Sequence, residues 1–129
     1  MKLFNRLPAL LVAALVALAP AVTLSWRAGR PVETGTPRTF AEGMATRTAF
    51  ELPQRILWEK LDDFVLVPDA DLRTAVRLMI ETTRNLTEPA GAAALAAALQ
   101  LKDSLRGRRV ALILSGANIT PSQLRDLLA

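Results

Sequence analysis

The sequence of 129 residues contains no cysteine and no histidine. Without cysteine the chain can form no disulfide, no thiolate nucleophile and no cysteine-ligated metal site. Without histidine it can build neither a Ser-His-Asp triad nor a histidine-bound zinc site. A general base would therefore have to be a lysine, an aspartate or a glutamate.

Tyrosine is also absent, and no row of aromatic residues alternates with the basic ones as a stacking platform for nucleic acid would require. The net charge of +4 comes from 16 basic and 12 acidic residues, and the arginines are scattered except near 106–109. A solvated basic surface explains this charge better than nucleic-acid binding does. With 51% apolar and 22% charged residues, the composition is that of one globular domain.

The first twenty residues, 1–20, differ from the rest. Lys2 and Arg6 precede an uncharged apolar run over 7–19, and Ala19-Pro20-Ala21 supplies small residues at a cleavage-like spacing. This layout is typical of a secretory signal peptide, and the run is short for a membrane span, which needs about 20 apolar residues. A Leu/Ala-rich core helix fits the same residues, and the two interpretations stay open.

The remainder predicts an α/β domain, because strand and helix patterns alternate after a loop-rich stretch over 25–50 that leaves room for a short helix. Apolar spacing, Pro53, a capping residue at Asp69 and a capping box at Thr120 mark the helices. The consecutive apolar residues of 109–114 predict a strand buried on both faces. The expected elements are helices over 51–61, 71–84, 88–107 (ending at Gly107) and from Pro121, and strands over 62–67 and 109–114.

Only two of these segments are convincing strands, and a parallel pair buried on both faces needs further strands and helical cover. The regular part therefore looks like a slice of a larger sheet. We expect it to leave apolar surface exposed along 109–114 and along the alanine-rich stretch 92–99.

The strand expected over 109–114 ends in Ser115-Gly116-Ala117-Asn118. In open α/β sheets, ligands bind outside the carboxyl ends of the strands, so these polar groups could face a ligand. An ordinary strand-to-helix turn explains the same residues and, on this stretch alone, is the commoner case.

Four motifs considered together are more specific. FAEG (40–43), LDDFVLV (61–67), EPAGA (88–92) and SGAN (115–118) resemble, in order and spacing, the C-terminal part of the threonine dehydratase family. These enzymes are pyridoxal-phosphate (PLP) dependent ammonia-lyases of fold type II, related to serine racemase. The resemblance covers about residues 19–129. It implies that 21–129 is the C-terminal part of the catalytic domain, an α/β slice of a tryptophan synthase beta-like fold, preceded by an apolar N-terminal helix.

The resemblance implies five cofactor-binding residues. Ser115 corresponds to the serine whose hydroxyl meets the pyridine nitrogen, Gly116 lets the backbone approach the ring, and Asn118 is the asparagine of the same motif. Glu88 matches a glutamate beside the ring, and Gly43 matches a glycine that lines the pocket. For Glu88 a helix N-terminus, where a carboxylate is favourable, is the alternative role, and the two roles are compatible.

A serine at the pyridine nitrogen suits elimination. A carboxylate there would keep the ring protonated and strongly electron-withdrawing, whereas a neutral hydroxyl does so much less. The residue type therefore favours loss of a β-hydroxyl over transamination.

Other parts of the family pattern have no match. The chain has only Lys2, Lys60 and Lys102, none of which stands in the lysine motif of the family, and its six glycines are never adjacent, so we find no catalytic residue and no glycine-rich phosphate loop. Leu15, Ala19 and Ala21 stand where some relatives have the Glu, Ala and Asp of a cation site, so we expect no metal site. Only eleven residues follow Asn118, too few for the regulatory domain of the long biosynthetic forms.

The resemblance implies a truncated threonine/serine dehydratase-like enzyme whose complete form converts threonine or serine to a 2-oxo acid and ammonia in the cytoplasm. We expect the isolated chain to be inactive. The alternative is a non-enzymatic, exported or membrane-associated product of a broken dehydratase gene, with 1–20 as signal or anchor. Substrate preference and homo-oligomer formation stay open.

Overall fold

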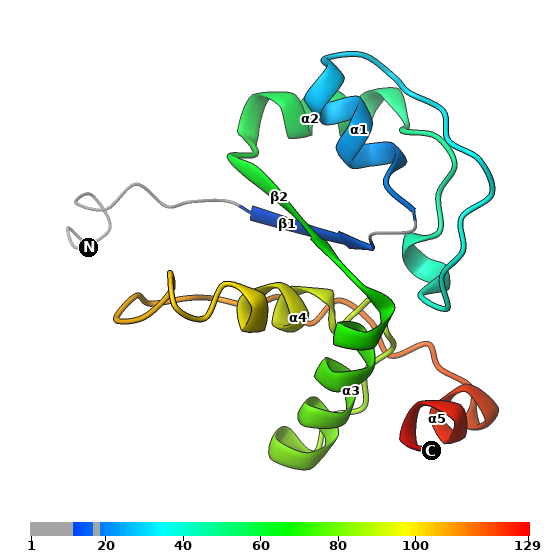
Figure 1. The fold of residues 1–129 in the computed structure, drawn as a ribbon, viewed down its shortest axis with the longest axis vertical. Helices are drawn as coiled ribbons and strands as arrows, with labels where there is room; N and C mark the ends of the chain where they lie inside the picture. Colours follow the sequence, from blue (N-terminus) through cyan, green and yellow to red (C-terminus); the bar gives the residue numbers. More distant parts are fainter. Residues whose placement is uncertain (1–11, 17–18) are drawn as a thin grey trace.

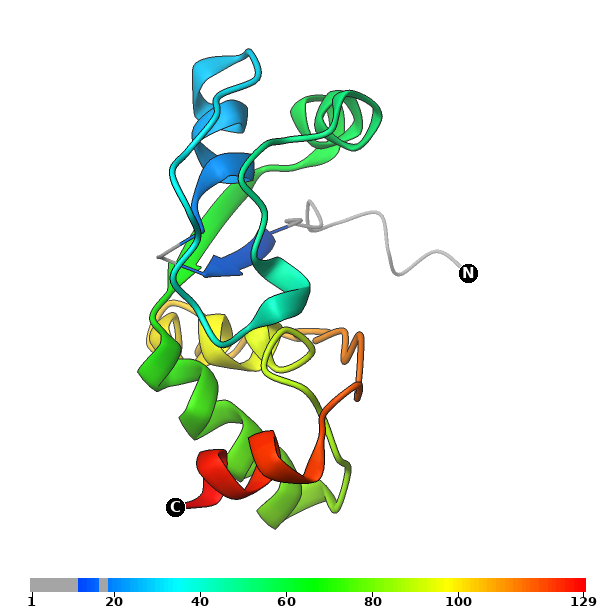
Figure 2. The same ribbon diagram turned by 90° about the vertical axis from the view of Figure 1, so that its right-hand side faces the viewer.

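The computed structural model describes residues 12–16 and 19–129. Two parallel strands form the sheet, and Figures 1 and 2 show helices on both of its sides, with α1 and α2 on one and α3, α4 and α5 on the other. The elements are β1 (Val12–Val16), α1 (Ala21–Ala28), a short 3-10 helix η1 (Glu42–Met44), α2 (Glu51–Lys60), β2 (Asp63–Val67), α3 (Asp69–Thr83), α4 (Ala93–Gln100) and α5 (Pro121–Leu128).

Strand β1 corrects the expectation of an apolar N-terminal helix. Val12–Val16 pairs with Asp63–Val67 in parallel register, Val12 opposite Asp63 and Val16 opposite Val67. A short apolar run does not distinguish a buried strand from a buried helix, and the β-branched Val12 and Val16 favour the strand. Residues 1–11 and 17–18, on which the signal-peptide interpretation also depends, lie outside the described residues. In the described part of the chain, no helix combines the length and the apolar character that a membrane span requires.

The core lies between the sheet, α3 and α4. Val67, Leu72 and Val76 are fully buried and pack with the alanines of α4 and the turn before it. Those alanines, at 92, 93, 96 and 97, form a stripe of small side chains that lets the helix approach both strands closely. The expectation that 92–99 would be exposed was therefore wrong for this stripe, although Leu99 remains on the surface.

Helices α2, α3 and α5 and strand β2 form where their patterns predicted them, and α1 begins before the stretch where a short helix was expected. Pro53 is the third residue of α2 and not the first. Two indole groups tie α1 to α2: Trp26 Nε1 donates to the Leu57 carbonyl and Trp58 Nε1 to the Trp26 carbonyl, each at 3.1 Å.

Asp69 does not cap α3 as expected, because Pro68 precedes the helix and Asp69 is its first residue. Its carboxylate instead accepts hydrogen bonds from the Thr39 hydroxyl at 2.7 Å and from the Phe40 amide at 3.3 Å. Asp69 thereby fastens the FAEG loop to the start of α3.

Segment 109–114 corrects the second strand expectation. It has no regular secondary structure and pairs with no strand among the described residues, and Val110, Leu112, Ile113 and Leu114 are 43–73% exposed. The helix expected over 88–107 is also shorter: α4 ends at Gln100, and turns continue to Gly107, whose φ is 75°. A strand needs a neighbour for its backbone hydrogen bonds, and in the described part of the chain the sheet contains β1 and β2 alone. As expected, this segment leaves apolar surface uncovered.

We predict that the isolated chain binds a hydrophobic dye through 109–114. Replacing Ile113, 73% exposed, by Asp should lower dye fluorescence and change the free energy of unfolding by less than about 0.5 kcal/mol. Leu86→Asp, which adds the same charge at an exposed leucine outside the segment, is the control. An isolated chain that binds no dye and unfolds in one sharp cooperative transition would contradict the prediction.

Candidate functional site

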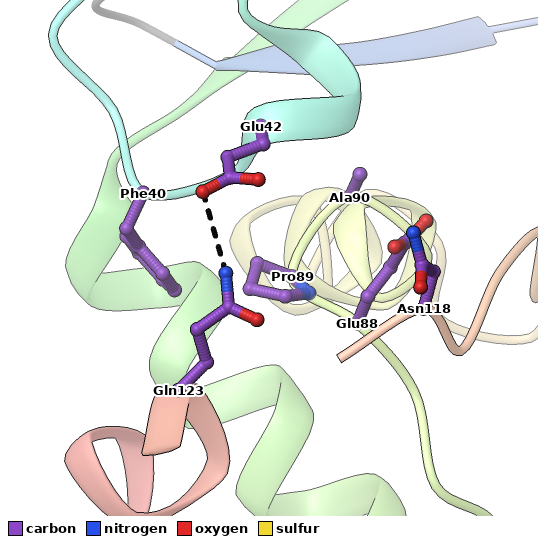
Figure 3. A pocket seen from close by; sticks show the side chains of 7 residues that line it. All are labelled: Phe40, Glu42, Glu88, Pro89, Ala90, Asn118 and Gln123. Carbon is purple, nitrogen blue, oxygen red and sulfur yellow. Dashed lines mark hydrogen bonds between the residues drawn. The ribbon is translucent and has the colours of Figure 1, made fainter. Parts of the chain in front are cut away.

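Three loop segments meet beside the N-terminal end of α4 (Figure 3). The FAEG loop is held by Asp69 and by Ala41, which is fully buried in the core. The EPAGA turn leads into α4. The SGAN turn leads into α5, which begins with the expected capping box: the Thr120 hydroxyl accepts from the Gln123 amide, and the Gln123 side chain accepts from the Thr120 amide.

The EPAGA and SGAN segments are pinned together at one carbonyl group. The Gly116 carbonyl oxygen accepts a hydrogen bond from the Glu88 amide at 3.1 Å and another from the Thr87 hydroxyl at 3.0 Å. Thr87 is fully buried, so this contact is shielded from water. The two turns therefore form one unit, although their motifs lie far apart in the sequence.

Glycines make this close approach possible. A Cβ at Gly91 would overlap the Gly116 backbone, and a Cβ at Gly116 would overlap the Glu88 carboxylate. A Cβ at Gly43 would come within 3.1 Å of Ala90 Cβ and 3.7 Å of Glu88 Oε1. The Glu88 carboxylate thus lies between Gly43 and Gly116.

A small open hollow of about 50 Å³ lies beside this unit. Figure 3 shows the side chains of Glu88 and Asn118 next to each other on one side of it. On the opposite side Gln123 Nε2 donates a hydrogen bond to Glu42 Oε1 at 3.3 Å. Phe40, Glu42, Glu88, Pro89, Ala90, Asn118 and Gln123 line the hollow.

The structure brings together four of the five predicted site residues: Glu88 and Asn118 line the hollow, and Gly43 and Gly116 lie beside the Glu88 carboxylate. Ser115 adjoins this group in the chain, but its side chain is exposed and does not line the hollow. Sequence reasoning missed Thr87, Glu42 and Gln123. Gln123 was seen only as a helix-capping residue, although the same position also reaches the FAEG loop.

The hollow fits part of a pyridoxal phosphate molecule. Small-molecule pockets usually enclose about 300–1,000 Å³, so a hollow of about 50 Å³ can serve only as one wall. Its polar groups, two carboxylates (Glu42 and Glu88) and two amides (Asn118 and Gln123) beside an exposed serine hydroxyl, can border the edge of a heteroaromatic ring. Among the described residues, no cationic side chain lines it to balance a phosphate. Lys60 is exposed and pairs with Glu59, and Lys102 is exposed as well.

Comparison with known proteins relates this arrangement to enzymes. The family model described as "Pyridoxal-phosphate dependent enzyme" matches residues 4–116. The chain is 32% identical over 105 residues to L-threo-3-hydroxyaspartate ammonia-lyase of Saccharomyces cerevisiae, covering 81% of this chain and 32% of the relative. It is 37% identical over 100 residues to the biosynthetic L-threonine dehydratase of Escherichia coli, covering 76% of this chain and 20% of the relative.

The fold agrees with these matches. Threonine deaminase isoform 2 of Solanum lycopersicum superposes with a TM-score of 0.84 at 27% identity, covering 92% of this chain and 33% of that protein. The chain thus spans about a third or less of the length of these relatives.

We predict that Gly91→Ala destabilises the fold more than Gly116→Ala does. At Gly91 the new methyl group meets the Gly116 backbone, which cannot move aside, whereas at Gly116 it meets the end of the Glu88 side chain, which can rotate. Overpacking of this kind costs about 1–3 kcal/mol. Urea unfolding would measure the loss.

Gly35→Ala is the matched control for the glycine variants. No atom of the described residues beyond its chain neighbours lies within 4 Å of the added carbon, so the free energy of unfolding of this variant should stay within about 0.5 kcal/mol of the original. Equal stability of the Gly91 and Gly35 variants would contradict the close contact between the two turns.

Proposed function

Because the chain belongs to the family of pyridoxal-phosphate dependent enzymes, we propose that it forms one wall of the cofactor pocket of a threonine/serine dehydratase-like ammonia-lyase. The reaction of the whole enzyme is the deamination of threonine or serine to a 2-oxo acid and ammonia by β-elimination. The observation that supports this most is that Glu88 and Asn118 line one hollow while Gly43 and Gly116 lie beside the Glu88 carboxylate.

Pyridoxal phosphate, when bound, supplies the electron sink for a carbanion at the α-carbon of the substrate. In our proposal the exposed Ser115 hydroxyl turns toward the pyridine nitrogen and forms a neutral hydrogen bond with it. Gly116 has no side chain, and the Glu88 carboxylate occupies the space that a Cβ would fill. In this proposal the Gly116 backbone and that carboxylate together lie beside the ring edge. With a neutral hydrogen-bond partner at its nitrogen, the pyridine ring would withdraw electrons only moderately. Moderate withdrawal suits a reaction in which the β-hydroxyl group leaves.

Glu88 and Asn118 border the same ring in this proposal. The Glu88 carboxylate is half-buried between two glycines, and its backbone is held by the bond from its amide to Gly116. The Glu88 backbone is therefore in place before a cofactor arrives, and its neighbour Asn118 offers an amide that can donate or accept a hydrogen bond. The proton-abstracting base and the groups that hold the phosphate come from outside this wall.

The names of the relatives support the substrate class. Threonine, serine and 3-hydroxyaspartate, named in these relatives, are amino acids with a hydroxyl group on the β-carbon. We propose a substrate of this class and a place in the cytoplasm. The comparisons support this reading and not the alternative of an exported or membrane-associated product without catalytic function.

We predict that the isolated chain does not attach pyridoxal phosphate covalently and releases no ammonia from threonine. Lys60 and Lys102 are exposed, and neither lines the hollow. A neutral hydrogen bond contributes about 0.5–1.5 kcal/mol, too little to hold a small anionic cofactor tightly. The test is to mix the protein with the cofactor, reduce with borohydride and map labelled lysines by mass spectrometry. Stoichiometric labelling of one lysine with ammonia release would contradict the prediction.

We predict that Ser115 matters electronically in a complete enzyme. A chimera in which this chain replaces the matching third of a threonine dehydratase supplies the missing groups. There Ser115→Ala should keep the fold but weaken cofactor binding about two- to tenfold, as loss of one neutral hydrogen bond implies, and slow elimination.

Ser115→Asp in the same chimera should increase side reactions that need a protonated ring, such as transamination. Cofactor titration and product analysis would measure both effects. Unchanged cofactor affinity and product distribution in both variants would show that Ser115 is not part of the cofactor site.

A further inference from the structure

The hydrogen bond between Gln123 and Glu42 crosses from α5 to the FAEG loop, and its surroundings point to a specific role. Gln123 uses both ends of its amide: Oε1 accepts from the Thr120 amide at 2.9 Å, and Nε2 donates to Glu42 Oε1 at 3.3 Å. The first bond belongs to the cap of α5, which directly follows the SGAN turn. The second reaches the residue next to Gly43. One side chain therefore links two of the three segments that form the site (Figure 3).

Few polar contacts hold the far end of the FAEG loop, although Met44, directly after Gly43, packs against the core. Asp69 holds the loop at Thr39 and Phe40, and Ala41 is buried in the core. Beyond Ala41, Glu42 and Gly43 are exposed, and the backbone bonds of 41–45 are turns within the loop itself. Among the described residues, the bond from Gln123 is the hydrogen bond that ties this part of the loop to another element.

Helix α5 is, in contrast, firmly seated on α3. Arg73 donates to the Asp126 carbonyl at 3.1 Å and Arg77 to the Leu127 carbonyl at 2.8 Å, at the C-terminal end of α5 where positive charge is favourable. Leu127 is buried in the core. Gln123 thus extends from a fixed support to the exposed residues Glu42 and Gly43, which lie between two residues packed in or against the core, Ala41 and Met44.

The same bond separates two hollows. A second crevice of about 180 Å³ lies beside the site, lined partly by Arg73 and Asp126. Phe40, Glu42, Pro89 and Gln123 line both hollows. If the Glu42–Gln123 contact opened, the small hollow beside Glu88 and Asn118 would join the larger crevice, and water would enter along that side.

We infer that Gln123 is a positioning residue for the cofactor wall: through Glu42 it holds Gly43 against the Glu88 carboxylate and closes the hollow on the side of α5. This inference rests on the proposed function. Gln123 acts through Glu42 and does not itself touch the ring.

Gln123→Glu tests this with little disturbance of the helix. Glutamate keeps the oxygen that accepts from the Thr120 amide and is itself favoured at this position of a capping box and near a helix N-terminus. It loses the donor and places a second carboxylate against Glu42. The double variant, Gln123→Glu with Glu42→Gln, restores one donor and one acceptor across the contact, with the two groups exchanged between the positions. Gln100→Glu is the control, because Gln100 Nε2 donates in the same way to Asp71 at 2.7 Å, on the exposed surface.

Two readouts follow the variants. In the isolated chain, amide hydrogen exchange at residues 43–45 should accelerate in Gln123→Glu and return in the double variant, with circular dichroism unchanged. In the chimera, Gln123→Glu should weaken cofactor affinity about two- to tenfold, the effect of one hydrogen bond, and the double variant should recover it. The Gln100→Glu variant should match the original chain in amide hydrogen exchange and in cofactor affinity.

The outcomes separate the inference from the proposal beneath it. Unchanged exchange and unchanged cofactor affinity in Gln123→Glu, in a chimera that binds the cofactor, would overturn the inference alone. If Gln123→Glu weakened cofactor affinity and the double variant did not restore it, the inference would also be overturned, because the effect would not pass through Glu42. A chimera with the natural pair that binds no cofactor would overturn the proposed function and the inference with it.

Discussion

The Gly116 carbonyl oxygen accepts hydrogen bonds from the Glu88 amide and from the buried Thr87 hydroxyl, and the rest of the site is arranged around this contact. Gly91 allows it, because any side chain there would meet the Gly116 backbone. With the two turns joined, the Glu88 carboxylate lies in the space that Gly116 and Gly43 leave open. A backbone contact thus helps to place a charged side chain.

The alanine stripe of α4 contributes to the same geometry from the core. Small side chains at 92, 93, 96 and 97 let α4 approach the sheet and α3. This fixes the first turn of the helix, and with it Glu88, against a rigid support. The uncovered apolar residues of 109–114 lie on the other side of the SGAN turn, where the chain offers no partner strand among its described residues. The site therefore lies between the packed core on one side and the uncovered apolar segment 109–114 on the other.

Local patterns predicted much of this structure. Helices α2, α3 and α5 form where apolar spacing predicted them, and of the capping signals the box at Thr120 is present as predicted. Pairing between distant segments was not predictable in the same way: the strand character of Val12–Val16 depends on β2, and 109–114 lacks the neighbour that its apolar run requires. The motifs named four residues that do come together, but the Glu42–Gln123 bond joins positions 81 residues apart and has no local signature. Asp69 was likewise expected to cap a helix, because no local sequence pattern indicates that Thr39 and Phe40 are its hydrogen-bond partners.

The central claim is that this chain forms the ring-side wall of a pyridoxal-phosphate pocket. A crystal structure of the chimera with bound cofactor tests it most directly. We expect the pyridine nitrogen within hydrogen-bond distance of Ser115 Oγ, with the ring edge beside Gly116 and the Glu88 carboxylate. A cofactor seated elsewhere, with Ser115 directed into solvent and Glu88 remote from the ring, would contradict the account.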